Sequence, residues 1–223
     1  MRSPFDWMGT MEWTAVVPMK SLPDAKSRLL PDDDPTRPEL ALAFLEDVLA
    51  ALDGAAAIAG VVIVTDDERV RRIVDASPAR WIAESPHTGL NPAAAFGAAS
   101  LPPGSAVAIV AGDLPCLTAE AVDLVLALAG ARERAFVSDA QGIGTTMLLD
   151  SVSANCSPAF GERSRARHVQ LGYVDIGLDS NAEARRLLAR ARRDVDTQVD
   201  LWDAMRLGVG AATSAVLLGA LAR

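Results

Sequence analysis

Residues 106–115 read AVAIVAGDLP, and this short stretch indicates the fold class of the chain. Its first six residues form an uninterrupted apolar run, which is typical of a strand covered on both faces of a sheet. The run leads directly into GDLP, so that Asp113 follows a buried strand. A second run of this kind, GVVIVT, occupies residues 60–65. Such strands predict an α/β fold with a mostly parallel mixed sheet and helices on both faces.

Strands and helices alternate along the rest of the chain. Apolar runs predict further strands over residues 13–17, 79–83, 135–139 and 145–149. Apolar positions at helical spacing predict helices over residues 37–53, 66–76, 91–99, 118–129, 181–192 and 199–207. Residues 19–35 hold three prolines and are expected to form a long loop. We expect residues 1–10 to be a disordered leader, with Met11 as an alternative start, and residues 11–223 to form one domain.

Composition excludes several classes of function. The formal net charge is −8 at pH 7, which argues against binding nucleic acid by phosphate neutralisation. No apolar run approaches the roughly 18 residues that a membrane span needs, because glycine, serine and threonine interrupt residues 209–222. Cys116 and Cys156 exclude a disulfide scaffold and show no zinc-binding spacing. We therefore expect a cytoplasmic protein without a signal peptide, whose partners are small molecules.

Ligands of parallel sheets bind at the carboxyl ends of the strands, which here selects the loops after Val17, Val64, Ala111 and Leu149. The first of these loops contains both lysines of the chain, Lys20 and Lys26, together with Arg28. Cations at this position can hold a polyphosphate and stabilise charge that develops on a phosphoryl group. A solvated surface loop explains the charges equally well, and the P-loop signature GxxxxGK[ST] is absent.

Three aspartates form a candidate metal site. Asp113 follows a buried strand, and Mg²⁺ needs only one or two protein carboxylates besides phosphates and water. Asp194 and Asp196 belong to the sequence DVDT, and residues two apart in an extended chain point to the same side. The alternatives are structural: a turn or helix cap for Asp113, and a capping turn before the helix at residues 199–207 for DVDT.

Two glycine-containing segments form a candidate anion site. GIGTT spans residues 142–146 and GERSRARH spans residues 161–168. Backbone N–H groups at Gly161 and the hydroxyls of Thr145 and Ser164 can bind an anion together. His168 by itself is more often a structural residue than a catalytic one. With no nucleophile-and-base arrangement apparent, cations, carboxylates and anion-binding backbone suit phosphoryl or nucleotidyl transfer.

Asn91, two residues after Gly89, opens a predicted helix. The simplest reading is that it caps this helix, and the alternative is that its carboxamide reads a nucleobase.

Five segments in order carry a family resemblance: VPMKSLPDAKSRL, GDLP, GIGTTML, FGERSRARH and DVDT. Over residues 13–214 the chain resembles the 2-phospho-L-lactate or phosphoenolpyruvate guanylyltransferases of coenzyme F420 biosynthesis. The resemblance implies a Rossmann-like (GT-A-like) nucleotidyltransferase sandwich. It also implies transfer of GMP from GTP to the phosphate of phosphoenolpyruvate or 2-phospho-L-lactate, with release of pyrophosphate.

The resemblance also implies roles for individual residues. The expected Mg²⁺ ligands are Asp113, Asp194 and Asp196. The expected acceptor-binding residues are Thr145, Gly161 and Ser164. Lys20, Lys26 and Arg28 are expected to hold the triphosphate, and Gly89 and Asn91 to contact guanine or ribose. Two departures from the family pattern are Gln198, where a proline is usual, and Arg165, where a small polar residue is common.

Two competing interpretations remain at this point. One is a related nucleotidyltransferase with another base or acceptor, of the molybdenum-cofactor or sugar-phosphate type; such enzymes usually carry a glycine-rich loop after the first strand, which this chain lacks. The other is a non-catalytic nucleotide-binding protein on the same fold. The sequence leaves open which of the two acceptors is used and whether the protein is a homodimer.

Overall fold

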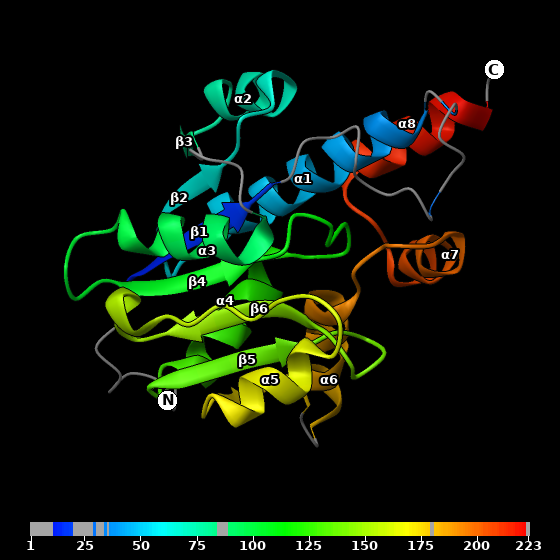
Figure 1. Ribbon diagram of the computed structural model, residues 1–223. Helices are drawn as coiled ribbons and strands as arrows, with labels where there is room; N and C mark the ends of the chain where they lie inside the picture. The colour runs from blue at the N-terminus through cyan, green and yellow to red at the C-terminus, as the bar shows by residue number, and fades with distance from the viewer. Residues whose placement is uncertain are drawn as a thin grey trace, which may run out of the picture.

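The computed structural model describes residues 11–19, Leu29, Asp34, and residues 36–83, 89–178 and 181–221. In these residues a seven-stranded sheet has the order β3-β2-β1-β4-β6-β5-β7, with helices on both faces (Figure 1). The strands are β1 (Trp13–Pro18), β2 (Ile58–Val64), β3 (Arg80–Ile82), β4 (Ala106–Val110), β5 (Arg134–Ser138), β6 (Thr145–Asp150) and β7 (Val174–Asp175). The helices are α1 (Thr36–Gly54), α2 (Glu68–Asp75), α3 (Leu90–Ala99), α4 (Ala119–Ala129), α5 (Ser164–Gln170), α6 (Ala182–Arg192), α7 (Gln198–Leu207) and α8 (Ala211–Leu221).

The predicted fold class is confirmed. Neighbouring strands pair in parallel except where β6 pairs antiparallel with both β4 and β5. This single reversal makes one of the four predicted ligand-binding loops wrong. The loop after Leu149 lies at the opposite edge of the sheet, because Asp150 pairs with Val107 at the start of β4. The first residue of β6, Thr145, lies instead at the edge where β1 and β4 end.

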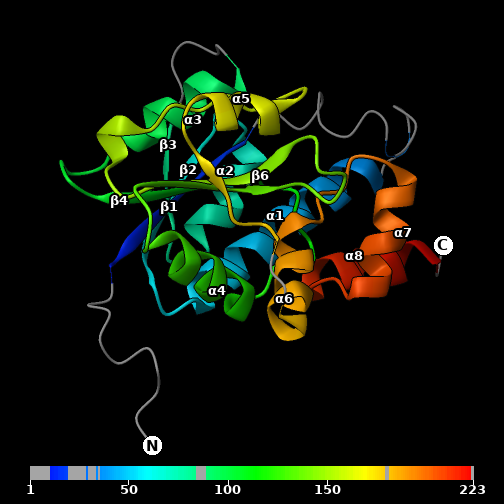
Figure 2. The same cartoon turned by 90° about the horizontal axis from the view of Figure 1, so that it is seen from below.

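Alternation along the strands divides the core between the two faces of the sheet. In β4, Ala108 and Val110 pack with α1, α4 and α6, whereas Val107 and Ile109 face the layer that contains α3. Figure 2 shows α3 and α5 on one side of the sheet and α4 and α6 on the other. Gly97 brings α3 close to the sheet, since a Cβ atom there would lie 2.4 Å from Cγ1 of Val16.

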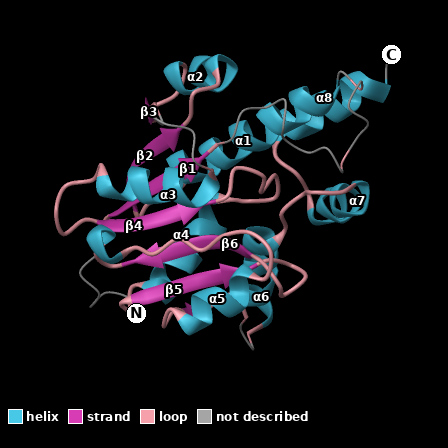
Figure 3. Cartoon of the chain, viewed as in Figure 1, coloured by secondary structure: helices cyan, strands magenta, loops and turns pink. Residues whose placement is uncertain are grey.

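A third apolar cluster joins α7 and α8 to the first half of α1. Figure 3 shows α8 alongside α1. Asp47 in the middle of α1 accepts hydrogen bonds from the backbone N–H groups of Ala212 and Thr213, at 2.9 and 3.1 Å, and so caps α8. No helix of the described residues is long and apolar enough to cross a membrane.

Most predicted elements are present within one or two residues of their predicted bounds, including α4 with Thr118 as its N-cap. The prediction lacked α5, β7 and α8. The expected leader, residues 1–10, and most of the expected loop, residues 19–35, lie outside the described residues.

Candidate active site

A cleft of about 740 Å³ opens at the sheet edge where β4 ends and β6 begins. It brings together six of the residues predicted from the sequence, namely Asp113, Thr145, Gly161, Ser164, Asp194 and Asp196. Lys20, Lys26 and Arg28 lie outside the described residues, so their predicted role stays a prediction.

The three predicted metal ligands all line this cleft. The backbone N–H of Val195 donates to the carbonyl of Asp113 at 3.1 Å, which fixes the loop after β4 against the segment after α6. Val195 is fully buried, while its neighbours Asp194 and Asp196 line the cleft, as expected for alternating positions of an extended chain. The cleft therefore receives carboxylates from two segments that are far apart in the sequence.

The helix caps test the capping alternatives for these residues. Thr118, not Asp113, caps α4, and its side chain accepts from the backbone N–H of Ala121 at 3.3 Å. Thr197 caps α7 in a capping box with Asp200, so the DVDT segment does serve as a capping turn. That role belongs to its threonine and leaves the two aspartates on the cleft.

The described carboxylates do not form a complete metal site by themselves. Within the part of the chain that the structure describes, no three His, Cys, Asp or Glu side chains are grouped to hold a metal ion. Carboxylate oxygens are nevertheless ligands that Mg²⁺ accepts, and this ion usually completes its shell with phosphate oxygens and water. The donor set therefore fits Mg²⁺ that arrives with a phosphate-bearing ligand.

The turn between β5 and β6 forms another wall of the cleft. Asp139 accepts hydrogen bonds from the backbone N–H groups of Ile143 and Gly144, both at 2.8 Å, and so fixes the turn. A Cβ atom at Gly144 would lie 2.4 Å from Oδ2 of Asp139, which explains the glycine. The sequence analysis missed Asp139 because it was placed within a strand. Its signal is one that it shares with Asp113: an aspartate close behind a buried strand.

Arg192, at the end of α6, holds this turn from outside. Its Nη2 donates to the carbonyl of Asp139 at 2.7 Å, and its Nε donates to that of Ser138 at 3.0 Å. Because Asp194 follows two residues later, one side chain connects the β5–β6 turn with the acidic segment.

Asn91 was predicted to contact the nucleotide, and in the structure its carboxamide binds the backbone of Phe160. Its carboxamide accepts from the N–H of Phe160 at 2.6 Å and donates to the carbonyl of Phe160 at 3.1 Å. This clamp fixes the segment that leads to Gly161. The expectation that Asn91 caps α3 is wrong, because the N-cap is Gly89, at φ 108°. Leu90, which lies between the predicted nucleotide contacts Gly89 and Asn91, lines the cleft.

Sequence reasoning also missed several other cleft residues. Gln141, Glu162, Arg163 and Asp200 all line the cleft. Arg163 is the sole basic residue among the described lining residues, and it has left-handed backbone conformation with φ 57°. Nothing in a single sequence marks such a conformation at an arginine.

The two departures from the family pattern are not among the residues that line the cleft. Arg165 forms an ion pair with Asp175 at 2.9 Å, which joins α5 to β7, and it does not line the cleft. Gln198 is the exposed first residue of α7, where proline is also well tolerated.

Both cysteines are unpaired, as predicted. Burial raises the pKa of the Cys116 thiol to about 11, so this residue is not a reactive thiolate at neutral pH.

His168 lies beneath the cleft and is fully buried. Three aromatic rings, those of Phe136, Phe160 and Tyr173, surround the imidazole at centroid distances of 5.4 to 5.7 Å. Burial, with a smaller contribution from the charge of Arg167, lowers the pKa of His168 from 6.5 to about 4. The residue is therefore neutral at neutral pH.

This lowered pKa predicts a pH-dependent stability. Below pH 6.5 the histidine of the unfolded chain binds a proton that the folded protein accepts only near pH 4. The free energy of unfolding is therefore expected to fall with decreasing pH in this window, by about 1.4 kcal/mol per pH unit from this group. Urea unfolding at pH 7, 6 and 5 should show a smaller decrease for His168→Asn than for the wild type. Equal slopes would contradict the buried neutral histidine.

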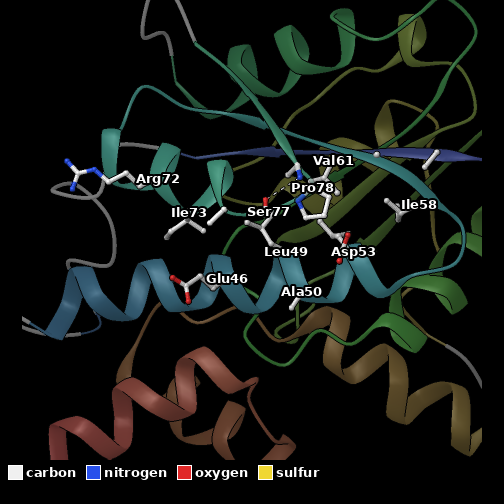
Figure 4. A pocket seen from close by; sticks show the side chains of 15 residues that line it. Glu46, Leu49, Ala50, Asp53, Ile58, Val61, Arg72, Ile73, Ser77 and Pro78 are labelled. Atoms are coloured by element: carbon white, nitrogen blue, oxygen red, sulfur yellow. Dashed lines mark hydrogen bonds between the residues drawn. The ribbon is translucent and has the colours of Figure 1, made fainter.

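A second hollow, of about 670 Å³, lies between α1 and the edge formed by β2 and α2 (Figure 4). Its walls are mostly apolar, with Leu49, Ile58 and Ile73 among them, and Asp53 lies at its rim. It contains none of the predicted site residues, so the cleft at the end of β4 is the candidate active site.

Comparisons with known proteins agree with this geometry. Residues 41–195 match the MobA-like NTP transferase domain. A protein of Streptomyces coelicolor named phosphoenolpyruvate guanylyltransferase is 46% identical over 210 residues, which cover 92% of this chain and 96% of that protein. A protein of the same name from Thermomonospora curvata is 39% identical and covers 92% of this chain and 89% of its own length.

Solved structures show the same fold at low identity. A 4-diphosphocytidyl-2C-methyl-D-erythritol synthase aligns with a TM-score of 0.58 and 14% identity, covering 88% of this chain and 99% of that one. A nucleotidyl transferase from Methanothermobacter aligns with a TM-score of 0.58 and 15% identity, covering 88% of this chain and 97% of its own. The arrangement of the sheet, the match over residues 41–195 and the close relatives agree, and the chain belongs to the phosphoenolpyruvate guanylyltransferase family of MobA-like nucleotidyltransferases.

Proposed function

We propose that this protein transfers GMP from GTP to the phosphate group of phosphoenolpyruvate and releases pyrophosphate, with Mg²⁺ as the cofactor. The observation that carries the proposal is the cleft itself, which is lined both by Asp113, Asp194 and Asp196 and by Thr145, Gly161 and Ser164. The name of the relatives supplies guanylyl transfer and the phosphoenolpyruvate acceptor. A role in coenzyme F420 biosynthesis, which the sequence resemblance implies, belongs to the same proposal.

The acceptor is the nucleophile in this reaction. One of its phosphate oxygens attacks the α-phosphorus of GTP, and the bond from that phosphorus to the oxygen bridging to the β-phosphate breaks. Because the attacking oxygen is already anionic, no strong general base is needed. The principal barriers are the repulsion between two anions and the charge that grows on the departing pyrophosphate.

The residues of the cleft divide this task. Thr145, Gly161 and Ser164 bind and orient the acceptor, which holds its phosphate near the α-phosphate. Carboxylates from the set Asp113, Asp194 and Asp196 would hold Mg²⁺ together with phosphate oxygens. When bound, Mg²⁺ supplies positive charge that neutralises the reacting phosphates. Lys20, Lys26 and Arg28 are proposed to neutralise the leaving pyrophosphate.

Measurement of pyrophosphate release tests the proposal. Purified protein is incubated with GTP and Mg²⁺, with phosphoenolpyruvate, 2-phospho-L-lactate or no acceptor. We expect release with GTP and phosphoenolpyruvate, and none without acceptor or after chelation of the metal. Replacement of GTP by CTP distinguishes the related nucleotidyltransferases of other base specificity. Absence of release with both acceptors would refute the guanylyltransferase assignment.

A further inference from the structure

His168 connects two parts of the cleft through its two ring nitrogens. The backbone N–H of Ala159, on the segment that leads to Gly161, lies 3.1 Å from Nε2 and donates to it. Nδ1 lies 2.8 Å from Oγ1 of Thr145, the first residue of β6. The fully buried imidazole thus contacts both sides of the predicted acceptor site from below.

These contacts determine which ring nitrogen carries the proton. A backbone N–H can only donate, so Nε2 must offer its lone pair to Ala159. The neutral ring then carries its proton on Nδ1 and donates it to Oγ1 of Thr145. The aromatic rings around His168 leave the imidazole buried and fixed in this orientation.

The hydroxyl of Thr145 is consequently constrained. Its oxygen accepts from His168, so its own hydrogen is the group left to donate. Among the residues that the structure describes, Oγ1 of Thr145 makes no second hydrogen bond, and the residue lines the cleft. A ligand with an anionic oxygen would supply the missing acceptor.

We propose that His168 is a positioning residue, which directs the hydroxyl hydrogen of Thr145 into the cleft and onto an anionic oxygen of the acceptor. The identity of the acceptor rests on the proposed function, whereas the tautomer of His168 does not. An imidazole with the opposite tautomer, or a protonated one, would present a donor to Ala159 N–H and lose this arrangement. The contribution of His168 is thus to make Thr145 a donor of fixed direction.

The first arm of the test needs no turnover. The chain contains two histidines, so a ¹⁵N-histidine sample of the His87→Asn variant reports His168 alone. We expect nitrogen shifts of a neutral imidazole protonated at Nδ1 at pH 7. Protonation at Nε2, or a charged ring at pH 7, would overturn the proposal even if the enzyme proved active with GTP and phosphoenolpyruvate.

The second arm compares two substitutions that each replace the imidazole with an amide. His168→Asn places an amide N–H₂ near the position of Nδ1 and keeps a donor for Thr145. His168→Gln places its amide near the position of Nε2 and keeps only the contact with Ala159. We expect His168→Gln to raise the KM for the acceptor about tenfold, the loss of about one hydrogen bond, with the KM for GTP unchanged. His168→Asn should stay within about threefold of the wild type.

The same substitutions in a Thr145→Val background show whether the change in acceptor KM depends on the Thr145 hydroxyl. There, His168→Gln and His168→Asn are expected to give the same acceptor KM, because no hydroxyl remains to be oriented. Equal effects of the two substitutions in the wild-type background, or a difference that persists in Thr145→Val, would assign His168 to packing alone. Failure of pyrophosphate release in every variant and in the wild type would refute the proposed function and leave the tautomer measurement as the deciding arm.

Discussion

Asp113→Asn is expected to reduce turnover by about 10³-fold while the far-UV circular dichroism spectrum stays unchanged. The side chain keeps its size but loses the negative charge that would help to hold Mg²⁺ in the cleft. The loop itself is fixed by the backbone, through the bond from Val195 N–H to the Asp113 carbonyl, and this bond survives the substitution. The readouts are pyrophosphate release at saturating GTP and the concentration of Mg²⁺ that gives half-maximal rate, which should rise.

Asp53→Asn provides a matched control for this experiment. It makes the same chemical change at a carboxylate on the rim of the second hollow, outside the candidate active site (Figure 4). We expect wild-type activity and wild-type dependence on Mg²⁺. If Asp113→Asn retained turnover like this control, the carboxylate of Asp113 would be only a turn residue and the metal site would have to be placed elsewhere.

Arg192→Met is expected to destabilise the protein by about 2–4 kcal/mol and to lower kcat/KM for the acceptor about 10²-fold. The methionine fills similar volume but leaves the carbonyls of Ser138 and Asp139 without their charged donor. The β5–β6 turn then loses the guanidinium that joins it to the segment carrying Asp194 and Asp196, and the bond from Thr146 Oγ1 to the Ala191 carbonyl remains. A displacement of about 1 Å between the two walls of the cleft accounts for a loss of this size.

Urea unfolding and acceptor kinetics, measured side by side, test this prediction. Arg186→Met is the matched control, because Arg186 is an exposed residue of the same helix. It should change the free energy of unfolding by no more than about 0.5 kcal/mol. Arg192→Lys should recover only part of the loss, since an ammonium group cannot reproduce the planar fork that spans several carbonyls. Wild-type stability and kinetics in Arg192→Met would show that the turn holds itself.

Much of the fold can be predicted from the sequence, because continuous apolar runs identify buried strands and their alternation with helices identifies the α/β class. The reversal of β6 could not be predicted in this way. An apolar run such as residues 145–149 has the same composition in either direction, and only the short connection through residues 139–144 suggests a hairpin. The error displaced one expected site loop to the wrong edge of the sheet.

In the candidate site, too, some residues could be predicted from the sequence and others could not. Asp113 was identifiable because it follows a buried strand directly, and the DVDT alternation placed Asp194 and Asp196 on one side. Hydrogen bonds between residues far apart in the sequence could not be predicted. The bonds of Asn91 to Phe160, and of His168 to Thr145 and Ala159, depend on how α3 and α5 pack on the sheet. The segment containing α5 was missed because its basic residues show no apolar periodicity.

The antiparallel placement of β6 also has a consequence for the order in which the protein folds. β5 and β6 are joined only by residues 139–144, whereas the pairing of β1 with β4 must close the chain over residues 19–105. Loop closure therefore costs least entropy at the hairpin, and contacts of short sequence separation form fastest. We therefore expect β5 and β6 to pair before the other strands of this sheet during folding. The wall of the cleft that carries Thr145 thus belongs to the part of the chain that can become ordered before the rest of the active site is assembled.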